Sequence, residues 1–266
     1  MKMIYTLCFL VFFFSCKPEQ PDDLISTEEF IIDYDGIDSV DIEITNFAQH
    51  ENYIPPAPEE PSVDSLKYLA LGDSYTIGQS VDPLLRWPVQ LVSLINESSQ
   101  EHYIYDPIII AQTGWTTANL NGSMDNQNID NSEFDLVSLL IGVNNQYQGL
   151  SLDQYELEYE ALLDRAISLA GDNPAQVFVV SIPDYGYTPF GAGNQENIST
   201  DLATFNEACR QITLSKNVSH YNITPISQQW PEIENLIASD NLHPSGYQYQ
   251  LWAESFYQQV IENHLP

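Results

Sequence analysis

The stretch Tyr68-Leu-Ala-Leu-Gly-Asp-Ser-Tyr75 joins a short apolar run to a Gly-Asp-Ser turn. A short apolar run is typical of a buried parallel strand, and a glycine just after it lets the chain turn sharply. The turn would present Ser74 at the carboxyl edge of a sheet, beside the N–H groups of a helix N-terminus, which stabilise negative charge. Ser74 is therefore a candidate nucleophile, although Asp and Ser are also ordinary helix-capping residues.

Further strand-like runs alternate with helical patterns along the rest of the chain. The clearest helix runs from Leu152 to Ala170, where apolar side chains recur at near-helical spacing, and an amphipathic helix follows from Ser245 to Glu262. This alternation predicts one α/β domain, residues 65–266, with a parallel sheet covered by helices on both faces. The expected strands are Lys67–Leu71, Tyr105–Ala111, Phe134–Ile141, Gln176–Ile182 and His220–Thr224.

Two of these runs end in residues that could stabilise an oxyanion. Gly114 follows the run that ends at Ala111, and Asn144 follows the run that ends at Ile141. Open parallel sheets bind ligands at the carboxyl ends of their strands, where Gly114 could offer its N–H and Asn144 its side-chain amide. Each segment by itself is also compatible with an ordinary turn from strand to helix.

The segment Asp240-Asn-Leu-His243-Pro244 places a carboxylate three residues before an imidazole. Across a tight turn, Asp240 could accept a hydrogen bond from Nδ1 of His243 and leave Nε2 free to take a proton from a serine. Of the five histidines, only His243 has this arrangement. The alternative is that Asp240 and Pro244 simply begin a helix.

In this order, the four segments resemble the SGNH hydrolases, also called GDSL-type esterases, over residues 66–265. The resemblance implies a three-layer α/β/α sandwich with a five-stranded parallel sheet in flavodoxin-like order. It also implies that Ser74 is the nucleophile, that His243 is the general base and that Asp240 orients His243. The N–H groups of Ser74 and Gly114 and the amide of Asn144 would form the oxyanion hole. No metal or organic cofactor is implied.

The sequence departs from the family pattern in two places. The first segment continues Tyr75-Thr rather than ending in leucine, and Asn145 stands where the family often has aspartate. The candidate pocket residues are Asp73, Trp115, Asn145 and Tyr185, the last within a Gly-rich and aromatic segment, residues 183–197.

The function expected from these residues is hydrolysis of a carboxylic ester through an acyl-serine. A small molecule or a glycan would carry the ester, with small acyl or carbohydrate-linked acetyl groups as the leading substrates. Lysophospholipids are the competing substrate class. A non-catalytic surface lipoprotein that binds glycan is the rival from a different class, although a binding module has no need of a base aligned to a nucleophile.

The pattern of the N-terminus predicts a targeting segment. Lys2 carries positive charge, residues 4–14 are apolar but too few to span a bilayer, and Ser15-Cys16 closes the segment. This ending resembles the lipobox of bacterial lipoproteins, which implies a signal peptide over residues 1–15, lipid attachment at Cys16 and a membrane-anchored, exported protein. A plain secretory signal is the alternative. Residues 16–64 are acidic and proline-rich, as expected of a tether, with a possible short β arm.

Acidic residues dominate the charge balance. The chain has 38 Asp and Glu against 7 Lys and Arg, a formal net charge of −31. Nucleic acid is excluded as a partner, because phosphate binding relies on clustered basic residues. The spacing of the three cysteines matches neither a zinc site nor a disulfide framework, and no phosphate loop or dinucleotide motif is present.

Overall fold

A computed structural model describes residues 64–127, 129 and 133–266. The predicted signal peptide, the lipid attachment site at Cys16 and nearly all of the predicted tether therefore lie outside the described residues. None of the helices in the described part of the chain has the length and apolar character needed to cross a bilayer.

The centre of the domain is a five-stranded parallel sheet in the order β4-β2-β5-β6-β7. This is the flavodoxin-like order, in which the first strand of the sheet lies beside the third. The strands are β2 (Tyr68–Gly72), β4 (Ile108–Ala111), β5 (Leu136–Leu140), β6 (Val177–Val180) and β7 (Ser219–Tyr221). The five-stranded α/β fold expected from the sequence is confirmed.

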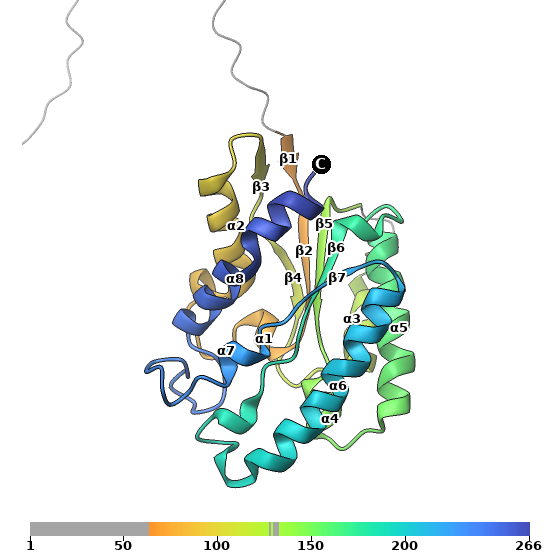
Figure 1. Cartoon of the computed structure of the whole chain (residues 1–266). Coiled ribbons are helices and arrows are strands. Elements are labelled where there is room, and N and C mark those ends of the chain that lie inside the picture. The colour runs from red at the N-terminus through yellow and green to blue at the C-terminus, as the bar shows by residue number, and fades with distance from the viewer. Residues whose placement is uncertain (1–63, 128, 130–132) are drawn as a thin grey trace, which may run out of the picture. The chain divides into compact units, whose positions relative to one another are not determined.

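Helices cover both faces of this sheet (Figure 1). Helices α2 (Trp87–Ser98) and α8 (Gly246–His264) pack against each other on one face, and α3 (Thr117–Gln127), α5 (Leu152–Leu169) and α6 (Gln195–Ser215) lie on the other. Three short helices follow strands directly: α1 (Ser74–Ile77), α4 (Val143–Tyr147) and α7 (Thr224–Ser227). The structure is thus the predicted three-layer sandwich.

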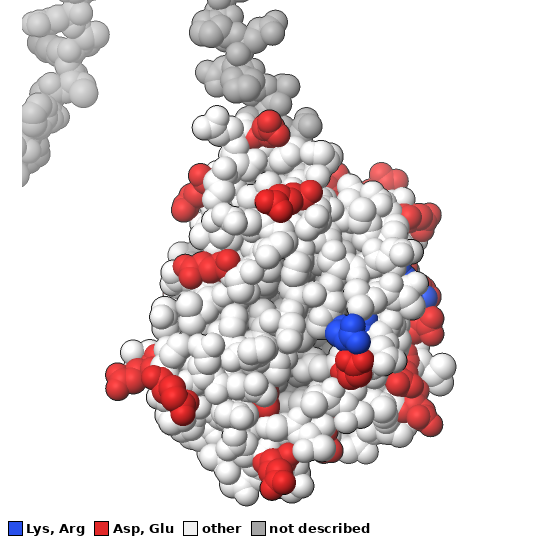
Figure 2. Space-filling model, viewed as in Figure 1, with Lys and Arg blue, Asp and Glu red and all other residues white. Residues whose placement is uncertain are grey.

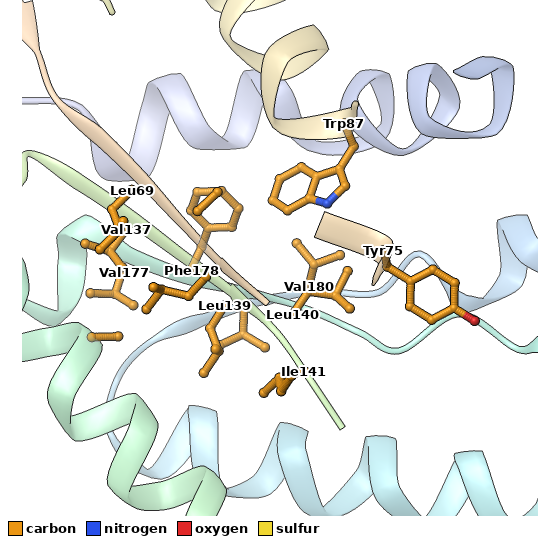
Figure 3. Packing of buried hydrophobic residues seen from close by; sticks show 14 of the residues in the cluster. Leu69, Tyr75, Trp87, Val137, Leu139, Leu140, Ile141, Val177, Phe178 and Val180 are labelled. Carbon is orange, nitrogen blue, oxygen red and sulfur yellow. The ribbon is translucent and has the colours of Figure 1, made fainter. Parts of the chain in front are cut away.

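The core lies between the sheet and these helix layers. Every residue of β2, β5 and β6 is buried, which explains why the three strands read as continuous apolar runs. Trp87 of α2 lies over the sheet with its ring 6.4 Å from the ring of Phe178 (Figure 3). Each fully buried side chain of this size contributes roughly 1.5 to 3 kcal/mol to folding. The rigid sheet fixes the carboxyl ends of β2, β4 and β5 side by side.

One part of the sheet differs from the prediction. The expected strand over Tyr105–Ala111 begins only at Ile108, and a separate strand β3 (His102–Ile104) pairs in parallel with β1 (Asp64–Leu66). Pro107 interrupts the run, because proline has no N–H to give to a neighbouring strand.

Candidate active site

Strand β2 ends at Gly72, and Ser74 is the first residue of helix α1. Asp73 caps that helix, with its Oδ1 accepting a hydrogen bond from the Tyr75 N–H at 3.0 Å. The turn packs tightly on the sheet: a Cβ at Gly72 would lie 2.6 Å from the carbonyl oxygen of Leu140. Since the first N–H groups of a helix have no partner within the helix, the Ser74 N–H remains available to a ligand.

The two predicted oxyanion donors lie on either side of Ser74 in the sheet order. Gly114 follows β4, and Asn144 lies on α4, directly after β5. The Nδ2 atom of Asn144 donates one hydrogen bond to the carbonyl oxygen of Trp115 at 2.9 Å. Because a primary amide carries two N–H groups, the second is left for a ligand. The switch point of the sheet, between β2 and β5, is where open sheets of this order bind ligands.

The predicted acid-base pair is formed in the turn before α8. Nδ1 of His243 donates to Oδ2 of Asp240 at 2.7 Å, and Oδ1 of Asp240 accepts from the backbone N–H groups of Leu242 and His243 at 3.0 and 2.9 Å. Burial raises the pKa of Asp240, but hydrogen bonds from Ser80 and from these backbone groups outweigh it and hold the pKa below its ordinary value. Asp240 is therefore ionised and fixes the His243 ring with Nε2 as its free nitrogen.

A single cavity of about 240 Å³ brings these segments together. Ser74, Gly114, Asn144 and His243 all line it. Its remaining walls are mostly apolar and include Tyr75, Thr113, Val143, Tyr147, Tyr185, Phe190 and Leu242. A wider groove of about 750 Å³ between α5 and α6 is open to solvent and is lined by no histidine. Of the two, only the smaller cavity is lined by both a serine and a histidine.

Three aromatic rings form one wall of this cavity, called here the aromatic wall: Tyr147, Tyr185 and Phe190. Their ring centroids are 6.2 to 6.3 Å apart, so the rings pack against one another. The Tyr185 hydroxyl donates to Oε1 of Gln146 at 2.9 Å, which holds one ring in place. Tyr147 and Phe190 are more than half exposed, so the wall can contact a ligand without rearranging the core.

The four candidate pocket residues have different positions. Tyr185 lines the cavity as expected, but Asp73, Trp115 and Asn145 do not. Asp73 is buried beneath the nucleophile turn, and the Trp115 side chain packs against the core. Asn145 is buried and binds the backbone N–H and hydroxyl of Thr117. These three side chains contact neighbouring residues rather than the cavity, so they support the structure around the site.

Sequence reasoning missed several residues of the site. Phe190 falls in the segment 183–197 that the sequence marked as a pocket border, but Tyr147 and Ser80 belong to no motif. Ser80 donates a hydrogen bond to Oδ2 of Asp240 at 2.6 Å across 160 positions of sequence. No sequence signal could have found this contact. Among the described residues, no group of three or more His, Cys, Asp or Glu side chains is placed to hold a metal ion.

Comparison with solved structures shows the same fold. An acetylxylan esterase from Geobacillus stearothermophilus has 18% identity and a TM-score of 0.57, over 77% of this chain and 99% of its own. A lipase/acylhydrolase from Enterococcus faecalis has 18% identity and a TM-score of 0.57, over 73% and 95%. A psychrotrophic esterase from Pseudoalteromonas sp. has 17% identity and a TM-score of 0.54, over 74% and 97%.

A search of curated proteins finds none that match this sequence. The model of the GDSL-like lipase/acylhydrolase family, in contrast, matches residues 70–251, which is more than half of the chain and includes Ser74, Gly114, Asn144, Asp240 and His243. The chain belongs to the GDSL-like lipase/acylhydrolase family.

Proposed function

We propose that this protein is an exported serine esterase that hydrolyses carboxylic esters of small acyl groups, including acetyl groups carried on carbohydrate. One observation carries the proposal: His243, oriented by Asp240 through Nδ1, lines the same cavity as Ser74 and the two further oxyanion donors, Gly114 and Asn144. A nucleophile, an oriented base and oxyanion donors in one cavity are the parts that acyl transfer requires.

The reaction proceeds in two acyl-transfer steps. Nε2 of His243 takes the proton of the Ser74 hydroxyl as Oγ attacks the ester carbonyl, and the resulting oxyanion is held by the N–H groups of Ser74 and Gly114 and by the amide of Asn144. As the intermediate collapses, the protonated His243 gives its proton to the departing alcohol. Water then attacks the acyl-serine with His243 again as base, which releases the carboxylic acid and restores Ser74.

The size and lining of the cavity support a small acyl group. Pockets for drug-sized ligands usually measure about 300 to 1,000 Å³, and this cavity, at about 240 Å³, is smaller. The aromatic wall offers apolar contact beside the nucleophile. The fold is shared with an acetylxylan esterase, which makes a carbohydrate-linked acetyl ester a natural candidate.

The proposal extends to the location of the enzyme. The apolar N-terminal segment and the Ser15-Cys16 ending support export with lipid attachment at Cys16, on a cell-envelope membrane. The acidic, proline-rich residues 17–64 would then hold the domain away from the membrane. Metabolic labelling with a fatty-acid analogue should mark the wild type and leave Cys16→Ser unlabelled. Equal labelling of both would rule out this anchor.

Ester hydrolysis by the purified protein tests the enzymatic proposal. We expect p-nitrophenyl acetate to be turned over and p-nitrophenyl octanoate to react far more slowly, with activity nearly abolished in Ser74→Ala. Asn144→Ala should lose on the order of 100 to 1,000-fold in kcat, the usual cost of one oxyanion donor. Ser93→Ala, a change of an exposed serine on α2, is the matched control and should behave as wild type.

The outcomes separate the alternatives. A preference for octanoate would favour the lysophospholipase-like reading over the short-acyl esterase. Turnover that survives in Ser74→Ala would contradict the assigned nucleophile. If no ester is hydrolysed, binding of acetylated xylo-oligosaccharides should be measured by calorimetry, because binding without turnover is what the glycan-binding alternative predicts.

A further inference from the structure

Ser80 makes a hydrogen bond that the reaction described above does not use. It lies in the turn that follows α1, six residues after the nucleophile. Its hydroxyl donates to Oδ2 of Asp240 at 2.6 Å. The same oxygen accepts the Nδ1–H of His243 at 2.7 Å. Ser80 therefore contacts the carboxylate at the atom that orients the base.

The Asp240 carboxylate has few other supports. Its Oδ1 is held by two backbone N–H groups of its own turn, those of Leu242 and His243. Its side chain is 28% exposed, so water competes for the carboxylate. Among the described residues, Ser80 is the one hydrogen-bond donor to Oδ2 that comes from outside this turn. Without it, the carboxylate could rotate about its Cβ–Cγ bond and change the direction of its hydrogen bond to His243.

The backbone of Ser80 gives a second, independent indication. Its φ is +67°, in the left-handed region that residues with a Cβ rarely adopt. Such conformations persist where the surroundings impose them, and they cluster at functional sites. In this conformation the hydroxyl contacts Asp240, although Ser80 itself is exposed.

The neighbouring residue strengthens the same link. The Thr113 hydroxyl donates to Oε1 of Gln79 at 2.6 Å, and Thr113 immediately precedes the oxyanion donor Gly114. Residues 79 and 80 thus connect the nucleophile segment to the oxyanion segment on one side and to the acid-base turn on the other. The three segments are far apart in sequence, and these two hydrogen bonds join them in the folded chain.

We propose that Ser80 is a positioning residue for catalysis, which holds the Asp240 carboxylate in the orientation that aligns His243 with Ser74. The inference rests on the proposed esterase function, since it assigns Ser80 a role in that reaction. It predicts that loss of the hydroxyl lowers kcat and leaves KM unchanged, because Ser80 lines no part of the substrate cavity.

Two substitutions separate this role from a structural one. Ser80→Gly removes the hydroxyl and makes the left-handed backbone easier, so we expect kcat to fall about 10-fold while Tm is kept or raised. Ser80→Thr keeps the hydroxyl but strains the backbone, so we expect a lower Tm with kcat within about twofold of wild type. Asn217→Gly, a left-handed residue after α6 and remote from the site, is the matched control and should leave kcat unchanged.

The experiment combines kinetics on p-nitrophenyl acetate with proton NMR of the whole protein. The downfield Nδ1–H resonance of His243, assigned by its loss in His243→Gln, should broaden in Ser80→Gly and persist in Ser80→Thr. If wild type hydrolyses no ester, the esterase proposal fails and with it the role of Ser80 in that reaction. A resonance that still responds in this way would then show only that Ser80 orients Asp240 and His243. The positioning role is overturned if Ser80→Gly keeps wild-type kcat, or if its resonance is unchanged.

Discussion

Asp73 carries a buried carboxyl group next to Ser74, the proposed nucleophile, and little stabilises the charge of that carboxyl group. Burial raises its pKa to about 7, and the hydrogen bond from the Tyr75 N–H lowers it only in part. Among the described residues, its Oδ2 atom has no hydrogen-bond partner. The pKa of Asp73 is higher in the folded protein than in the unfolded chain. The stability that Asp73 contributes is therefore fully present below about pH 4 and is lost as the pH rises through 7.

Replacing Asp73 by Asn should therefore stabilise the protein at alkaline pH. The Asn side-chain oxygen can still cap α1, but it carries no charge at any pH. We expect the variant to match wild type near pH 4 and to exceed it at pH 8 by a few kcal/mol in the free energy of unfolding, since each unit of pKa shift is worth about 1.4 kcal/mol. Urea unfolding at both pH values measures this difference.

The control for Asp73→Asn is Asp82→Asn. Asp82 is exposed and caps a short helical turn by the same kind of contact, to the Leu84 N–H at 2.9 Å. We expect this change to alter the free energy of unfolding at pH 8 by no more than about 0.5 kcal/mol, the usual range for a surface substitution. If wild type and Asp73→Asn have the same free energy of unfolding at pH 8, the proposed cost of burying the Asp73 charge is contradicted.

At the residue scale, the motifs predicted candidate site residues but not the contacts that form only in the folded chain. Ser74, Asn144 and His243 were predicted, because each stands at a strand end or beside a partner three residues away. The contact from Ser80 to Asp240 joins residues 160 positions apart, and the bond from Asn144 to Trp115 uses a backbone carbonyl. A carbonyl has the same chemistry in every residue, so no residue type could reveal that bond.

Among the secondary-structure elements, α4 carries Asn144, the proposed oxyanion donor, and its start depends on the glycine that caps it. Gly142 caps α4 with a φ of +129°, and a Cβ there would lie 2.6 Å from Cε2 of the buried Tyr155 ring and 3.0 Å from Cδ1 of Ile182. Tyr155 cannot move away easily, because it packs against Tyr159 and Phe205 in the core. Asn144 follows two residues later, so its amide depends on this turn.

Gly142→Ala should lower both stability and activity. We expect a loss of about 2 to 5 kcal/mol in the free energy of unfolding, from backbone strain together with overpacking, and a fall in kcat as the Asn144 amide is displaced. Gly171→Ala is the control: its φ is +65°, but no atom lies within 4 Å of an added Cβ. Denaturant unfolding of both variants tests the argument, and equal losses would refute the steric part of it.

The longest element with a strong pattern was predicted well, and only two of the very short strands were missed. The helix expected over Leu152–Ala170 is α5, Leu152–Leu169, because its buried and exposed residues alternate with helical period over five turns. Strands β1 and β3 have three residues each, too few for a period to be visible. The order of strands in the sheet came from the family resemblance, since alternation of elements does not determine which strands are neighbours.

At the scale of the whole molecule, acidic residues far outnumber basic ones. Figure 2 shows acidic side chains spread over this face of the domain and few basic ones. Arg165, Arg210 and Lys216 each form an ion pair with at least one acidic side chain, so much of the small positive charge is already engaged. The formal net charge of the whole chain is −31, and the excess of acidic side chains on the domain produces a negative field at low salt.

This field should discriminate against anionic substrates, and salt should remove the discrimination. The Debye length is about 30 Å at 0.01 M salt and about 3 Å at 1 M, so repulsion between the domain and an approaching anion is screened over that range. We expect kcat/KM for an anionic ester, mono-p-nitrophenyl succinate, to rise several-fold with added NaCl relative to neutral p-nitrophenyl acetate. Potassium chloride should act identically, because screening depends on ionic strength and not on the cation. The ratio of the two kcat/KM values could instead stay constant between 0.01 M and 1 M NaCl. That result would mean that the field of the acidic surface does not extend to the cavity and that the acidic residues serve solubility alone.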